Sequence, residues 1–353
     1  MTLTMALAIA AVVVLAALAL HAWWSTRSSA PKQAEPVRAG AAPDARLEPS
    51  LDVGEAAADV AERVADPGVV LEPRPVPQRR AARLDALVDA IAPLAVEAPV
   101  SGEAVLAHLP PTRRAGTKPF LIEALNAETG EWEQPLAGRR YGEFQAGVQL
   151  ANRHGPLNEI EYSEFVQKVQ AFADAVGALP DFPDMLDVVT RARELDAFAQ
   201  AHDAQLVMRL RANSVAWSVG YLQQAAARHG LVPGAVPGRL VLPGEGDGVP
   251  PVLVLSFDAQ AALAEDPNQS ALREAALSLD VPQTPEAAEP FAAWQRVGRD
   301  LCDDLDATLV DEAGHPITLH AFGAIDQELR TLYRALEARD IAAGSAAARR
   351  LFS

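Results

Sequence analysis

The chain has 353 residues, of which 50% are hydrophobic and only 5% aromatic, so it is long enough for roughly one or two packed domains. Its formal net charge of −17 and isoelectric point of about 4.8 disfavour binding to the phosphate backbone of nucleic acids. Its single cysteine, Cys302, excludes an intramolecular disulfide and fits a reducing compartment.

Residues 1–26 are predicted to form a transmembrane anchor. An uncharged apolar run extends from Leu3 to Trp24. As a helix it covers roughly 33 Å, enough for a hydrocarbon core of about 30 Å. No Lys or Arg precedes the run, whereas Arg27 and Lys32 follow it. We therefore expect an uncleaved anchor with a periplasmic N-terminus and cytoplasmic C-terminal domains. The alternative is a cleaved signal peptide and a periplasmic protein.

Residues 27–82 differ in composition and are rich in proline and alanine. Prolines recur through the region, at Pro31, Pro36, Pro43, Pro49, Pro67, Pro73, Pro75 and Pro77. This composition predicts a disordered, partly extended linker, because it offers too little apolar surface to bury. The linker would set how far the folded part reaches from the membrane.

A first α+β unit is predicted over residues 83–203. Alternating and helical hydrophobic periods, with turn residues between them, define its elements. In chain order these are a strand at 84–99, a helix at 101–109, a hairpin at 118–135, a strand at 141–152, and helices at 158–177 and 183–201. Ser101 is a suitable N-cap for the first helix, and Gly177 a suitable end for the second.

A second α+β unit is predicted over residues 204–342, followed by a tail at 343–353. Its strands are expected at 204–212, 238–244, 250–258, 272–282 and 307–314, and its helices at 214–230, 288–305 and 318–338, the last one capped by Thr318. In the helix at 214–230, Val215 is expected to face inward and Gly230 to form the C-cap.

The two units have elements of the same kind in nearly the same order, so the first is interpreted as a possible divergent copy of the second. The fold class is α+β: an N-terminal transmembrane helix, a Pro-rich linker, and antiparallel-sheet, split β-α-β domains with helices on one face. The other face of such a sheet must bind a partner, pack on the neighbouring unit or face solvent.

Motifs typical of enzymes are not found. The GEGDG segment at 244–248 precedes two prolines and a strand, whereas phosphate-binding loops open a helix. His315 and His320 lie on either side of Pro316 without a third ligand nearby. We expect a non-enzyme without cofactor or metal.

The second unit resembles a known family. Residues 272–332 read LREAALSLDVPQTPEAAEPFAAWQRVGRDLCDDLDATLVDEAGHPITLHAFGAIDQELRTL. This stretch is similar to the C-terminal domain of ZipA, the membrane anchor of the bacterial cell-division protein FtsZ. The shared features are a strand ending in Val281-Pro282, a long amphipathic helix, the short strand around Leu309 and a final helix. The anchor and Pro-rich linker match the family plan, whereas residues 84–203 have no counterpart in it.

The resemblance implies a split β-α-β fold that binds the C-terminal tail of FtsZ on its exposed sheet face, without a cofactor. Strand alternation places that face on the side opposite Met208 and Leu277. The predicted partner-binding residues are Val207, Arg209, Val241, Val254, Ala276 and Ser278. The face would then be mixed, with arginines beside a small apolar patch, whereas the family's face is an apolar groove.

These observations favour a single-pass adaptor at the bacterial inner membrane that holds FtsZ polymers at the septum during cell division. The alternative is a bitopic scaffold that binds another division or envelope protein, for instance through residues 84–203. An RNA-binding module, also known for split β-α-β sheets, would need exposed aromatic side chains on its central strands, and these strands carry Val and Arg instead.

Overall fold

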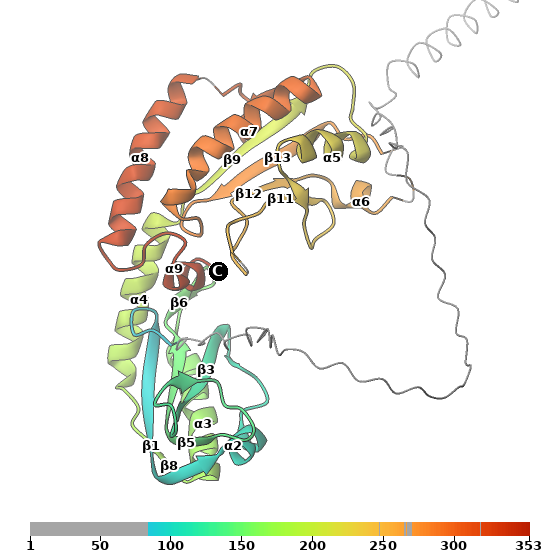
Figure 1. Ribbon diagram of the computed structural model, residues 1–353. Helices are drawn as coiled ribbons and strands as arrows, with labels where there is room; N and C mark the ends of the chain where they lie inside the picture. The colour runs from blue at the N-terminus through green and yellow to red at the C-terminus, as the bar shows by residue number, and fades with distance from the viewer. Residues whose placement is uncertain (1–83, 247, 265, 267–269, 318) are drawn as a thin grey trace, which may run out of the picture. The chain divides into compact units, whose positions relative to one another are not determined.

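The computed structural model describes residues 84–246, 248–264, 266, 270–317 and 319–353 (Figure 1). Within this part the chain is mixed α+β, with two larger antiparallel sheets and eight α-helices. The anchor predicted for residues 1–26, the linker at 27–82 and the Thr318 cap lie outside the described residues.

The first sheet has the strand order β2-β3-β5-β1-β8, and β4 pairs with β3. Its strands are β1 (Asp89–Ser101), β2 (Arg114–Ala115), β3 (Lys118–Asn126), β4 (Trp132–Glu133), β5 (Arg140–Gln149) and β8 (Ala178–Pro180). A small hairpin, β6 (Ala151–Asn152) and β7 (Gly155–Pro156), follows β5. The associated helices are α2 (Gly102–His108), α3 (Glu159–Val176) and α4 (Met185–His202).

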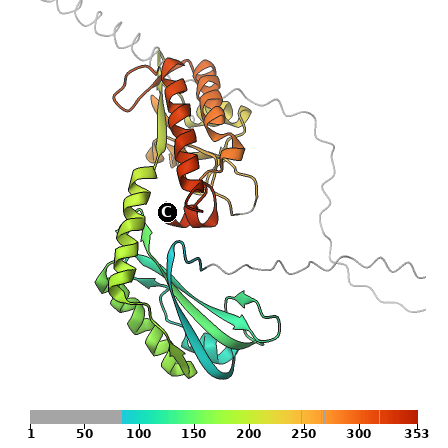
Figure 2. The same ribbon diagram turned by 90° about the vertical axis from the view of Figure 1, so that its left-hand side faces the viewer.

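Helix α3 covers one face of this sheet, and its ends are fixed by local chemistry. Asn158 caps it with its side chain and Glu161 completes a capping box, while Gly177 ends it in the left-handed conformation (φ 70°). Phe165 and Phe172 of α3 meet aromatic side chains of β3 and β5 at ring-centroid distances of 5.7 and 5.6 Å. Figure 2 shows α3 and α4, in yellow-green, on one side of the blue-green strands.

The second sheet has the order β10-β11-β12-β13-β9-β14. Its strands are β9 (Gln205–Ala212), β10 (Val232–Pro233), β11 (Arg239–Leu242), β12 (Leu253–Ser256), β13 (Glu274–Asp280) and β14 (Ala307–Val310). The helices are α5 (Val219–Arg228), α6 (Ala259–Ala262), α7 (Pro290–Leu305), α8 (Leu319–Glu337) and α9 (Ala346–Leu351), with a 3₁₀ turn at Glu286–Ala288. Helices α5 and α7 lie on one face (Figure 1). Trp294 of α7 donates its indole N–H to the carbonyl of Leu277 at 3.0 Å.

The two sheets share one connection plan. In each sheet a central strand (β1 or β9) is followed by a helix (α2 or α5). The chain then passes through β3 or β12 and on to β5 or β13, which pairs both with that strand and with the central strand. A long helix (α3 or α7) then returns the chain to an edge strand (β8 or β14) on the other side of the central strand, and a second long helix follows. The three-residue strand β8 was not predicted from the sequence.

The helix expected over residues 214–230 is shorter than predicted. It begins at Val219, after Ser218, whose side chain accepts a hydrogen bond from the N–H of Tyr221 at 3.1 Å, so Val215 lies outside it. The preceding residue, Trp217, forms a β-bridge with Leu272 and is fully buried. This tertiary pairing overrides the local helical period. The C-cap is His229, one residue before the predicted Gly230.

The segment 343–353, expected to be a tail, contains the folded helix α9, so the helix at 319–337 is not the last. Four of its apolar side chains are buried in the core cluster of the first sheet: Ala347, Ala348, Leu351 and Phe352. Arg350 forms an ion pair with the buried Asp89 of β1, with Nη1 at 2.6 Å from Oδ2. The C-terminal residues are therefore part of the first unit's core.

Candidate functional site

The open face of the second sheet carries all six residues predicted to bind a partner. In one row of side chains, Val241 pairs with Val254, Val254 with Ser278, and Ser278 with Val207. In the next row, Ser256 pairs with Ala276 and Ala276 with Arg209. Residues in register across antiparallel strands point to the same side of the sheet. The structure therefore brings these residues together in two adjacent rows, which we call the open-face rows.

The opposite side of the same strands is the core, which fixes the direction of the open-face rows. The alternate residues Met208, Leu255 and Leu277 are fully buried. Gly298 of α7 lies so close to β9 that an added Cβ would clash with the Met208 sulfur. A shift of the strand register by one residue would turn Met208, Leu255 and Leu277 to the open face. The packing of α7 therefore fixes the register.

Two arginines flank the middle of the second open-face row, which continues beyond Arg209 to Val310 of β14. Arg239 of β11 pairs with Ser256, so the row runs from Arg239 through Ser256 and Ala276 to Arg209. Three strand spacings separate the backbones of the two arginines, or about 14 Å. Both guanidinium groups belong to exposed residues, and none of the hydrogen bonds or ion pairs among the described residues engages either. The row thus has a short, uncharged middle between two cations.

Two other charged residues of these strands lie beside residues of opposite charge. Arg211 lies beside Glu274 in the register of β9 and β13. Asp280 accepts hydrogen bonds from Arg153, with Oδ2 at 2.7 Å from Nη1. An anionic ligand on the second open-face row would meet Arg209 and Arg239, neither of which has an acidic residue opposite it in the register.

A shallow hollow of about 270 Å³ lies on the same face. Its lining includes Val254, Ser256, Ser278 and Arg239, and the consecutive Pro250 and Pro251 form part of its wall. The hydroxyls of both serines donate to carbonyls of the neighbouring strand, at 3.3 and 3.1 Å. The two hydroxyl groups on the floor of the hollow therefore already have hydrogen-bond acceptors, so the floor can accept apolar side chains. Sequence reasoning missed the two prolines, because their place beside the rows depends on the loop between β11 and β12.

The described residues include one thiol and several histidines and carboxylates. None of their His, Cys, Asp and Glu side chains gather in groups of three or more that could hold a metal ion. Burial raises the pKa of the Cys302 thiol to about 12, so it is a weak nucleophile at neutral pH. The geometry of the open-face rows suits a peptide with an apolar centre and acidic ends.

Among residues 84–353, apart from the gaps named above, no helix is both long and apolar enough to cross a membrane. Comparison with protein-family models finds no matching family, and comparison with curated proteins finds no matching relative.

Proposed function

We propose that the chain is a membrane-tethered adaptor of bacterial cell division that binds the C-terminal tail of FtsZ on the open-face rows and holds the septal ring at the inner membrane. The observation that carries the proposal is the pair of unengaged arginines, Arg209 and Arg239, on either side of the uncharged Ser256 and Ala276 in one open-face row. The sequence resemblance to the ZipA family supplies the identity of the partner.

The arrangement of the second sheet supports this proposal. A split β-α-β domain of the family is expected to have helices on one face of an antiparallel sheet and a free face on the other. Here α5 and α7 cover one face, and Val207, Val241 and Val254 are half-buried on the other. Half-exposed valines beside a hollow can bury further apolar area when a peptide docks.

The proposed mechanism is stoichiometric. The predicted N-terminal anchor confines the domain to the membrane, and the linker at 27–82 sets its reach. Each contact with one tail can be weak, because a polymer offers many tails to many tethered domains. Retention then comes from multivalency rather than from one strong site.

The test is fluorescence anisotropy with residues 84–353 and a labelled FtsZ C-terminal peptide. Val254→Asp and Ala276→Asp each place a carboxylate in an open-face row and should weaken binding at least tenfold. Leu263→Asp is the matched control, because Leu263 is 70% exposed and lies outside the rows. It should bind as the parent does.

Charge reversal provides a second arm. Exposed ion pairs contribute about 0.2–1 kcal/mol each. Arg209→Glu combined with Arg239→Glu should therefore weaken binding several-fold and reduce its dependence on salt concentration. If neither the peptide nor intact FtsZ polymer binds, the proposal fails. The alternative of a scaffold for another envelope protein would then be pursued on residues 84–203.

A further inference from the structure

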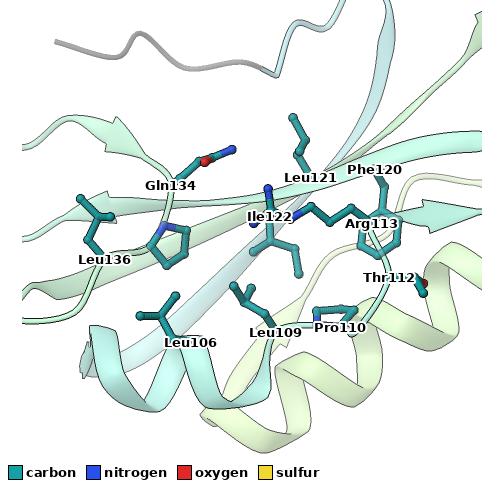
Figure 3. Close-up of a pocket in the computed structure, with 11 residues that line it drawn as sticks. Leu106, Leu109, Pro110, Thr112, Arg113, Phe120, Leu121, Ile122, Gln134 and Leu136 are labelled. Carbon is teal, nitrogen blue, oxygen red and sulfur yellow. The ribbon is translucent and has the colours of Figure 1, made fainter. Parts of the chain in front are cut away.

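The first unit has an apolar pocket at the edge of its sheet, separate from the open-face rows (Figure 3). It lies beside β3 in the stretch between the part paired with β2 and the part paired with β4. Leu106 and Leu109 line it from α2 and the residue after it, and Pro135 and Leu136 line it from the segment after β4. Leu106 and Leu136 are 42% and 49% exposed, so the apolar wall continues to the surface.

The backbone of β3 is open to a partner at this pocket. Phe120 donates its N–H to the carbonyl of Arg113 at 3.0 Å, toward the edge away from β5. Strand N–H groups alternate in direction, so the Ile122 N–H points to the same edge. Among the described residues, no backbone carbonyl accepts a hydrogen bond from the Ile122 N–H at this edge. The segment after β4 continues into Pro135, which has no N–H to donate. One strand position at this edge is therefore free.

The pocket's size and charge define what can occupy that position. The pocket has a free volume of about 80 Å³. One water-sized group needs about 10–15 Å³ of such volume, so the pocket has room for the four carbons of an aliphatic side chain. A residue that pairs with Ile122 would point its side chain to the same side as Ile122, which itself lines the pocket. Arg113 also lines it, and no hydrogen bond or ion pair among the described residues engages its guanidinium.

We propose that this pocket is a second peptide-docking site, which takes an extended acidic segment of a partner protein. One aliphatic side chain fills the space between α2 and Leu136, the main chain bonds to the Ile122 N–H and carbonyl, and a neighbouring carboxylate pairs with Arg113. The site goes beyond the proposed function, because it belongs to the first unit and uses neither the open-face rows nor the FtsZ tail.

The test uses the full-length chain and two labelled heptapeptide probes. Both have a central leucine, flanked by aspartates in one probe and by lysines in the other. Anisotropy should show at least fivefold tighter binding of the acidic probe. Methylation of the main-chain nitrogens of the probe should weaken binding at least fivefold, because it removes the hydrogen bond to Ile122. Hydrogen exchange of the β3 amides should slow when the acidic probe is added.

Variants locate the binding. Leu106→Gln and Leu136→Gln should each weaken it at least fivefold, and Arg113→Glu should reverse the preference between the two probes. Leu186→Gln is the control, since Leu186 is 70% exposed on α4 and does not line the pocket. Circular dichroism checks that every variant is folded. The proposal is overturned if millimolar acidic probe leaves β3 exchange unchanged, if the pocket variants bind as the control does, or if Val254→Asp abolishes binding.

Discussion

The ion pair between Asp89 and Arg350 allows a sharp test of how the C-terminal residues stabilise the first unit. Asp89 is 1% exposed. Its carboxylate accepts hydrogen bonds from both terminal nitrogens of Arg350 and from the N–H of Asp85 at 2.9 Å. Arg350→Ala removes the two charged donors and leaves the buried carboxylate with the single backbone donor.

The magnitude follows from this geometry. Removing one partner of a buried ion pair costs about 3–5 kcal/mol. The Arg350 side chain is 26% exposed, so water can reach the vacated space, and the Asp85 N–H remains in place. We therefore expect Arg350→Ala to lower the free energy of unfolding by about 2–3 kcal/mol.

Urea unfolding of residues 84–353, followed by circular dichroism, measures this loss. Arg349→Ala is the matched control, because it removes a neighbouring arginine of α9 that makes no ion pair with a described residue. A double variant, Asp89→Asn with Arg350→Met, removes both charges and should stay within about 1 kcal/mol of the parent. A cost for Arg350→Ala no larger than that of Arg349→Ala would refute the reasoning.

Three further predictions follow from buried polar groups. Burial raises the pKa values of Cys302 and Tyr162 to about 12, so above about pH 9 the unfolded chain loses these protons before the folded chain does. The free energy of unfolding therefore falls as the pH rises. Cys302→Ala and Tyr162→Phe should each make this fall smaller, as measured by urea unfolding between about pH 8 and 10.5. Glu161 accepts hydrogen bonds from the N–H and hydroxyl of Thr117 at 2.8 and 2.7 Å, so Glu161→Ala should cost about 1–3 kcal/mol in thermal unfolding, and a cost below about 0.5 kcal/mol would contradict this. The buried indole of Trp217 donates to a backbone carbonyl of α7 at 2.7 Å; Trp217→Phe should cost about 1–3 kcal/mol in the same assay, and an unchanged midpoint would argue against it.

The open-face rows could be predicted from the sequence because they depend on a strand period that is local. In β9 and β13 the largest apolar side chains, those of Leu206, Met208, Leu210, Leu277 and Leu279, stand at every second position, so this set was expected to face the core. The structure has Met208 and Leu277 fully buried and Val207 and Ser278 on the other side. The pairing between strands, which aligns the rows, then follows from one consistent register.

Other features depend on contacts that no local pattern contains. The strand β8 has three residues, and it forms because Leu94, Ala95 and Val96 of β1 offer a free edge there. The pocket beside Ile122 exists because β2 and β4 are both short and leave a gap between them. Helix α9 is a six-residue, alanine-rich segment whose order comes from burial against another unit rather than from helix propensity.

The position of α9 has a consequence for biosynthesis. The core of the first unit is built from residues 88–199 together with residues 336–352, including Ala347 and Phe352. At about 5–20 residues per second, a ribosome needs roughly 7–30 s to proceed from Ala199 to Ala347. During that interval the nascent first unit lacks part of its core and the partner of Asp89. The first unit is therefore finished only after residues 336–352 have left the ribosome, so a stop codon placed between residues 200 and 336 leaves this unit without part of its core.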